Sequence, residues 1–324
     1  MKKYCFYALS MLAVATWSVS LTSCKDDDDD NSGSVAASDT PSPTVTDSYG
    51  AKHRVTSFGD YSYSYDKNGK LTAIYDDDEL IQSGSGLTFR DKGKDEYDEW
   101  DCTIKFALNQ RGYVSEASES FYDKDSDGEW ERGTIHNSYT YDSEGQLNRI
   151  TSTASGSYRE DGKTYAFSWK DKTTLTWSDS KLLQVTYEWT ETDEGDDEDN
   201  DSGSYTYTLQ YGTQANSARQ WLHVIDRMVE DMIDFTEALS PLGLFGRGPA
   251  YLPIRYSQNG YSSTLAYTLN ANGTIHSDNG RIYTYDDATR STVAVAPTTR
   301  QVPSKNKVHN IHKRFQARKM ARKL

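Results

Sequence analysis

Carboxylates at alternating positions are the strongest candidate for chemistry in this chain of 324 residues. Asp123, Asp125 and Asp127 stand before a glycine with the spacing of the first half of a calcium loop, and Glu129 offers another oxygen. The bidentate Glu that such a loop carries at its last position is replaced by Thr134. The alternative is an ordinary Asp-Gly hairpin tip, which we favour. We therefore expect weak calcium binding at most, and no other cofactor.

Catalytic motifs are missing from the sequence. His53, His136, His223 and His276 lack metal-ligand spacing, and no nucleophile elbow, zinc-protease motif or phosphate-binding glycine loop is present. Two carboxylates could form a glycosidase pair only if the fold brought them together. We predict that the protein is not an enzyme, and a glycan-active enzyme is our third hypothesis for its function.

The first residues have the pattern of an export signal. Lys2 and Lys3 precede an apolar run, and small residues stand in front of Cys24. Lipoprotein signal peptidase accepts such a site, so we expect residues 1–23 to be removed and Cys24 to carry the lipid. Cys102 is then alone in the mature chain, which excludes an intramolecular disulfide. We expect Cys102 to be a small apolar residue of the core.

An acidic run follows the lipidation site directly. It resembles the signal that sends lipoproteins of Bacteroides-type bacteria to the cell surface, and it consists of Lys25, Asp26, Asp27, Asp28, Asp29 and Asp30. A solvated spacer is the plainer interpretation, and the two are compatible. On the first interpretation we expect the protein at the outer membrane, anchored by its lipid and exposed on the cell surface.

Composition divides the rest of the chain. Residues 24–50 are rich in Ser, Thr, Pro and Asp, which predicts a disordered tether. Residues 51–298 are expected to form one β domain, and residues 299–324 a basic tail. This tail either solvates itself or is attracted to phosphates or to an acidic partner. The formal net charge of −14 argues against nucleic acid and anionic membranes as partners of the body, which we expect to be monomeric.

A repeated turn motif predicts the architecture. An apolar residue, Asp or Asn, two variable positions, Gly, a spacer and an aliphatic residue recur at 65–71, 108–114, 141–147 and 269–275, and a copy at 177–183 has Lys in place of Gly. Asp or Asn opens a type I turn, and Gly supplies the residue with positive φ that a hairpin needs. The flanking residues alternate as in strands. We predict an all-β fold, a single antiparallel β-meander curled into a barrel-like sheet that hides its edges.

One helix interrupts the strand pattern. From Ser217 to Leu239 apolar residues recur at spacings of three and four, and Ser217 with Gln220 forms a capping box. We predict an amphipathic helix over residues 217–239 whose apolar stripe covers one face of the sheet. The opposite side carries Asp226, Glu230, Asp231, Asp234 and Glu237. A partner-binding helix is the alternative.

The segment after the helix carries a resemblance. Gly243-Leu244-Phe245-Gly246, then Arg247, and Leu252-Pro253 before the last hairpins resemble a family of Bacteroides-type surface lipoproteins with a porin-like domain. The resemblance extends from about Arg54 to Tyr285, and the long acidic hairpin and basic tail depart from it. It implies a curved antiparallel sheet and no assigned activity. A membrane pore does not fit, because Ser and Thr alternate with Tyr in strands such as Tyr61–Tyr65.

These observations favour a binding protein. Our leading hypothesis is a surface-anchored module for a glycan or a partner protein, with Tyr and Trp side chains at one end of the sheet as the contact surface. A structural or envelope-assembly lipoprotein without a small ligand is the alternative.

Overall fold

The computed structural model describes residues 44–286 except 47, 50, 77–78, 84–86, 95–97, 161, 194–201 and 230–235. The predicted signal peptide, export signal and basic tail lie outside these residues. The strands are β1 (Val45–Thr46), β2 (Lys52–His53), β3 (Val55–Phe58), β4 (Tyr61–Tyr65), β5 (Leu71–Asp76), β6 (Glu79–Ser83), β7 (Leu87–Lys94), β8 (Asp98–Leu108), β9 (Val114–Asp125), β10 (Trp130–Tyr141), β11 (Leu147–Glu160), β12 (Lys163–Ser178), β13 (Lys181–Asp193), β14 (Ser202–Ala215), β15 (Tyr251–Gln258), β16 (Tyr261–Thr264), β17 (Tyr267–Leu269), β18 (Ile275–Asp278) and β19 (Arg281–Tyr285). The helical elements are α1 (His223–Val229), α2 (Thr236–Leu239) and a 3-10 turn, η1 (Ser240–Leu242).

The strands form an antiparallel meander that curls on itself. From β3 to β19 they follow one another in sequence order, and β19 pairs with β3. The strand pairing is interrupted between β16 and β17, which follow each other directly along the chain. There the Leu265 N–H bonds Ile254 of β15, and the Ala266 carbonyl accepts from Asn279 after β18. The predicted fold class, an all-β meander curled into a barrel-like sheet, is confirmed.

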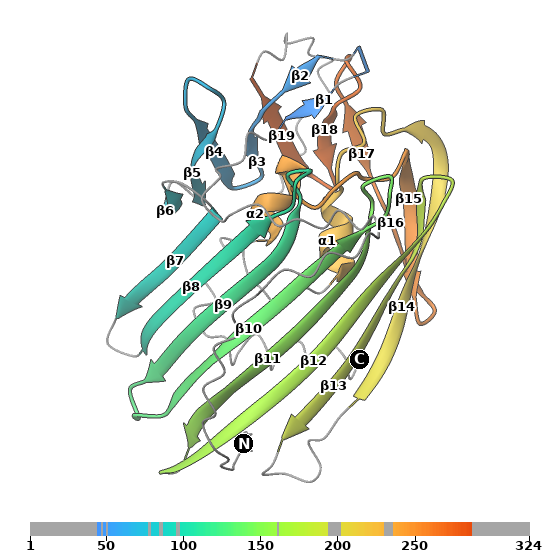
Figure 1. Cartoon of the computed structure of the whole chain (residues 1–324). Helices are drawn as coiled ribbons and strands as arrows, with labels where there is room; N and C mark the ends of the chain where they lie inside the picture. The colour runs from blue at the N-terminus through green and yellow to red at the C-terminus, as the bar shows by residue number, and fades with distance from the viewer. Residues whose placement is uncertain are drawn as a thin grey trace, which may run out of the picture.

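Long and short strands occupy different parts of the molecule. Strands β7 to β14 form a tall curved wall, whereas β1 to β6, β17 to β19 and both helices gather at one end of it (Figure 1). Within the described residues, no helix is long and apolar enough to cross a membrane.

The hairpin tips form as the repeated motif predicts. The Asp66 Oδ1 atom accepts from the backbone N–H groups of Asn68 at 2.8 Å and Lys70 at 2.9 Å, and Asn109 does the same at the next tip. Gly69 follows with φ of 77°, a backbone conformation that residues with a side chain rarely adopt. The tip at 177–183 differs, because Asp179 and Ser180 both have positive φ and form a tight turn without glycine.

The ordered domain begins earlier than predicted. Val45 of β1 pairs with His53 of β2 and is buried in the core, so the boundary expected at residue 50 is too late. Val45 is a single apolar residue among Thr, Ser and Pro, and one such residue is too weak a pattern to predict a strand.

The helix begins later than predicted, at His223. The capping box at Ser217 does not form, because the Gln220 side chain bonds other elements: its Oε1 accepts from the Ile275 N–H at 2.7 Å, and its Nε2 donates to the Tyr285 hydroxyl. The first helical N–H group donates instead to Asp278 of β18 at 2.8 Å. The apolar stripe is core where the structure describes it, since Trp221, Ile225, Met228 and Leu239 are buried.

Inside the wall, aromatic rings lie over glycines of the neighbouring strand. Each of four hairpins contains one such cross-strand pair: Trp100 with Gly93, Phe121 with Gly133, Phe167 with Gly156, and Trp189 with Gly203. A Cβ atom at Gly156 would come within 2.5 Å of the Phe167 ring. The inner face is therefore packed by large rings that only glycine accommodates.

Candidate functional site

The predicted calcium-loop residues lie on the β9–β10 hairpin. Asp123 is buried on the inner face of β9, while Asp127 lies beyond the end of that strand and is exposed at the tip, so the turn separates them. In the part of the chain that the structure describes, no group of three or more His, Cys, Asp or Glu side chains could hold a metal ion. Cys24 and residues 25–30 fall outside that part.

Asp125 has a structural role in this hairpin. Its Oδ1 atom accepts from the backbone N–H groups of Asp127 and Glu129, both at 3.0 Å, and Gly128 has φ of 83°. This is the arrangement at Asp66 and Asn109, so residues 125–128 are a further copy of the turn motif. The Asp-Gly interpretation describes this loop.

Charged residues gather between the helices and the last hairpins. Arg281 Nη2 contacts Glu237 Oε1 at 2.5 Å, and His223 Nδ1 lies 3.8 Å from the same atom and 3.9 Å from Asp226 Oδ2. The Trp221 Nε1–H donates to Asp226 Oδ1 at 2.6 Å. Asp226 was expected on the exposed side of the helix, but its carboxylate lies within this cluster, beside Trp221 and His223.

Burial dominates the electrostatics of this cluster. It raises the pKa of Asp226 well above its ordinary value, against the hydrogen bonds from Ser240 and Trp221. Burial also raises the pKa of Asp278 to about 6, although the His223 N–H and the Asn279 amide both donate to it. We assign the cluster a structural role, because its groups join α1 and α2 to β18 and β19.

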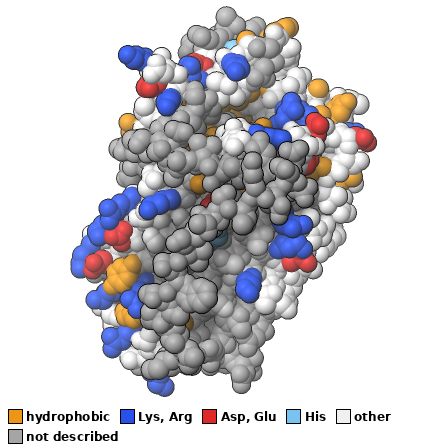
Figure 2. All heavy atoms as spheres, in the orientation of Figure 1, with side chains coloured by type: hydrophobic (Ala, Val, Ile, Leu, Met, Phe, Trp, Pro, Cys, Tyr) orange, Lys and Arg blue, Asp and Glu red, His pale blue; other side chains and the backbone are white. Residues whose placement is uncertain are grey.

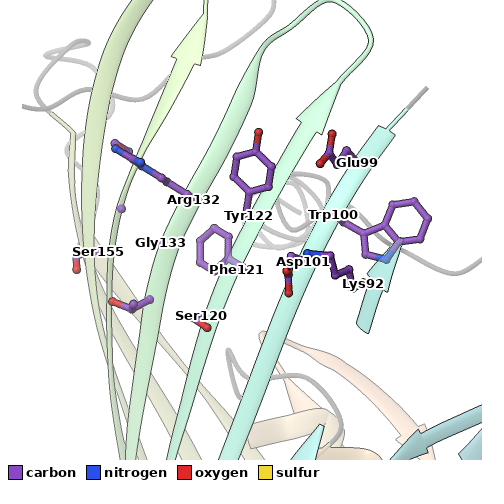
Figure 3. A pocket seen from close by; sticks show the side chains of 13 residues that line it. Lys92, Glu99, Trp100, Asp101, Ser120, Phe121, Tyr122, Arg132, Gly133 and Ser155 are labelled. Carbon is purple, nitrogen blue, oxygen red and sulfur yellow. Dashed lines mark hydrogen bonds and ion pairs between the residues drawn. The ribbon is translucent and has the colours of Figure 1, made fainter. Parts of the chain in front are cut away.

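A groove on the outside of the wall is the candidate binding site. It has a volume of about 760 Å³, crosses strands β7 to β11 and is open to solvent (Figure 3). Its lining residues are Lys92, Glu99, Trp100, Asp101, Ser120, Phe121, Tyr122, Arg132, Gly133, Thr134, Ser155, Gly156 and Ser157.

Strand register arranges the groove as two rows of outward side chains. The wall row runs Lys92, Asp101, Tyr122, Arg132, Ser157 across five strands, and each residue is the cross-strand partner of the next. The floor row, two residues along each strand, runs Ser120, Thr134, Ser155. Short hydroxyl side chains beside long ones produce the hollow.

Charges in the wall row are only partly paired. Lys92 Nζ contacts Asp101 Oδ2 at 2.6 Å, and this hydrogen bond lowers the pKa of Asp101. Arg132 is exposed, its guanidinium carbon lies 4.9 Å from the centre of the Trp130 ring, and its Nε–H donates to Ser157 Oγ at 3.4 Å. No described carboxylate lies within ion-pair distance of the Arg132 guanidinium group. The groove thus presents hydroxyls, one tyrosine and a guanidinium group held by an aromatic ring.

The aromatic contact surface stays a prediction, and the structure buries some of the rings that could contribute to it. Tyr63, Tyr139, Tyr187 and Trp169 are buried, while Tyr49, Tyr251 and Tyr261 are the exposed tyrosines among the described large side chains. The groove residues were not predicted, because their proximity depends on the register of five strands. A usable signal was present: Ser and Thr recur at alternate positions of β9, β10 and β11.

Comparison with family models finds no match, and neither does comparison with curated proteins. Solved structures that resemble this chain include two porin-like proteins. A porin-like protein from Bacteroides uniformis is 16% identical, with a TM-score of 0.37, covering 72% of this chain and 93% of the other. A porin-like protein from Bacteroides vulgatus is 16% identical, with a TM-score of 0.35, covering 75% and 92%. At values this low, function has to be argued from the chain's own residues.

Proposed function

We propose that this protein is a lipid-anchored surface lipoprotein that binds a glycan or a partner protein in the groove over β7 to β11. The groove carries the proposal, because its two rows combine hydrogen-bonding side chains with an aromatic ring in an open hollow of about 760 Å³. The lipid on Cys24 and the acidic run after it would display the domain at the outer membrane.

The outer face of the wall is polar, which suits a domain surrounded by water. Its outward positions carry Lys105, Arg132 and Lys170 among serines and threonines. A Lys or Arg facing lipid at the bilayer midplane costs about 2–4 kcal/mol. A surface of this kind favours a tethered domain over an inserted pore.

We further propose that the groove performs no reaction. Its carboxylates are partly exposed, and each has a Lys partner: the hydrogen bonds from Lys94 and Lys92 lower the pKa of Glu99 and of Asp101. A glycosidase needs one carboxyl group with a raised pKa to act as an acid. The groove has no such group.

A binding screen tests this function. The full chain with Cys24→Ala, which we expect to be soluble, is applied to a glycan array and used to capture surface proteins. Tyr122→Ala should weaken whichever ligand is found, whereas Tyr261→Ala, at an exposed ring on β16, should not. A ligand that binds both variants as it binds wild type would place the site elsewhere. The absence of any ligand would favour the structural alternative.

A further inference from the structure

We propose that the ligand of this groove is an acidic glycan, a sugar chain bearing carboxylate or sulfate groups. This inference rests on the proposed binding function and adds the chemical class of the ligand. It is carried by a basic surface on a chain whose formal net charge is −14.

Four neighbouring rows of outward side chains define this surface, which we call the basic face. In register across β7 to β12 the rows are Lys94, Glu99, Lys124, Trp130, Arg159, Thr164; Lys92, Asp101, Tyr122, Arg132, Ser157, Ala166; Arg90, Thr103, Ser120, Thr134, Ser155, Ser168; and Thr88, Lys105, Ser118, His136, Thr153, Lys170. They contain eight Lys or Arg residues against two carboxylates. Figure 2 shows Lys and Arg side chains along the margin of the molecule where β7 lies.

Strand alternation separates the charges. Four further acidic residues of these strands point inward, since Glu119, Asp123, Glu131 and Asp171 are buried, while Glu116 is exposed beyond the last of the four rows. On β12 the change occurs between adjacent positions, since Lys170 and Lys172 are exposed on either side of buried Asp171. An approaching ligand therefore meets a positive face on an acidic protein.

Much of this positive charge is available to a ligand. In the described part of the chain, Lys105, Lys124, Arg132, Arg159 and Lys170 make no ion pair within the 4.0 Å that defines one. Lys92 and Lys94, in contrast, contact Asp101 and Glu99. Arg132 is the central unpaired cation in the groove, and its guanidinium carbon lies over the Trp130 ring at 4.9 Å from the ring centre. A planar guanidinium group can donate two parallel hydrogen bonds to one carboxylate or sulfate.

The groove floor favours a sugar chain over other polyanions. The hydroxyls of Ser120, Thr134 and Ser155 can exchange hydrogen bonds with sugar hydroxyls along the groove. Single-stranded nucleic acid is bound on stacking platforms of several exposed rings. Tyr122 and Trp130 are the partly exposed rings of the basic face, and Trp130 already lies against Arg132, so one ring is left for a ligand, which suits one sugar better than successive bases. A flat anionic membrane would not enter a hollow between rows of side chains.

The test compares polymers that differ only in charge. Polygalacturonate and its fully methyl-esterified form are titrated against the full chain with Cys24→Ala, with chondroitin sulfate as a sulfated ligand. We expect both acidic polymers to bind, the ester to bind at least tenfold more weakly, and affinity to fall as salt rises. Arg132→Gln should reduce affinity for polygalacturonate about tenfold. Arg132→Lys should reduce it by less, because lysine keeps the positive charge but lacks the two parallel N–H donors of a guanidinium group.

A matched control and the competing outcomes complete the experiment. Lys172→Gln changes an outward lysine of β12 that pairs with Glu188, and it should bind like wild type. Equal melting temperatures would show that the variants are folded. The proposal is overturned if the neutral ester binds as tightly, if Arg132→Gln has no effect, or if single-stranded DNA or anionic vesicles bind more tightly than either acidic polymer. Capture of neutral glycans or proteins alone would refute the acidic ligand and leave the binding function standing, whereas no binding at all would refute both.

Discussion

Asp278 should make this protein less stable as pH rises across the weakly acidic range. Its carboxylate is buried at the start of α1, and burial raises its pKa from 3.8 to about 6. A carboxyl group with a raised pKa in the folded state stabilises the fold when protonated. This stability is fully present below about pH 4 and is lost as pH rises to about 6, where the ionised form prevails in both states.

The magnitude follows from the shift in pKa. One pKa unit corresponds to about 1.4 kcal/mol, so ionised Asp278 costs the folded protein about 3 kcal/mol above about pH 6. Asp278→Asn removes this pH-dependent cost. It also removes one acceptor, because both oxygens of Asp278 accept hydrogen bonds, from His223 and Asn279. The variant should therefore start about 1–3 kcal/mol less stable at low pH but lose less on going to neutral pH.

Urea unfolding near pH 4 and near pH 7, at equal ionic strength, measures this difference. Wild type should lose about 3 kcal/mol more than Asp278→Asn between the two conditions. The raised pKa of Glu131 acts equally in both proteins and cancels in the comparison, whereas the charge of Asp278 contributes to the raised pKa of Asp226, so the measured difference includes this coupling. Glu99→Gln is a control of opposite sign, since Lys94 lowers the pKa of Glu99. Identical pH dependence in wild type and Asp278→Asn would refute the reasoning.

Further substitutions test the core, the calcium hypothesis and the location. Met228 is buried in α1, so Met228→Asp should lower the free energy of unfolding by about 3–5 kcal/mol and Met228→Leu by under about 1.5 kcal/mol; an unchanged denaturation midpoint for Met228→Asp would mean an exposed stripe. Calcium and magnesium at equal ionic strength should raise the melting temperature equally in wild type and in Asp125→Asn, and a calcium-specific rise abolished by the substitution would establish a site. Cys24→Ala should release the protein from membranes, and alanine at residues 26–30 should hide it from protease added to whole cells. If both variants stay membrane-bound and accessible, the lipoprotein hypothesis fails.

Features with local causes were predictable from sequence. The hairpin tips depend on one Asp or Asn and one Gly within a few residues, as at Asp66 and Gly69. The helix start depends on distant partners. Gln220 bonds residues 55 and 65 positions away, so the capping box that its spacing predicts never forms. Local pattern therefore placed the helical region correctly and its first residue six positions too early.

The groove could not be predicted for the same reason, on a larger scale. Tyr122 meets Arg132 because both lie at the same level of one hairpin, and this much is readable from the turn at residues 125–128. Extending the row to Lys92 and Ser157 requires the registers of three further strand pairs, and an error of one residue in any of them would turn its side chain to the other face.

The formal net charge of the chain does not describe the charge that a partner meets on the outer face of the sheet. The formal charge of −14 counts carboxylates wherever they lie, including Glu119 and Asp171 inside the barrel-like sheet. A ligand bound outside responds mainly to charges within the Debye length, about 8 Å at physiological salt. Because side chains alternate along each strand, Lys170 lies on the opposite face from its neighbour Asp171. The side chains at alternate positions of β7 to β12 thus predict the sign of the charge that a partner meets on the outer face. The total charge of the chain does not predict this sign.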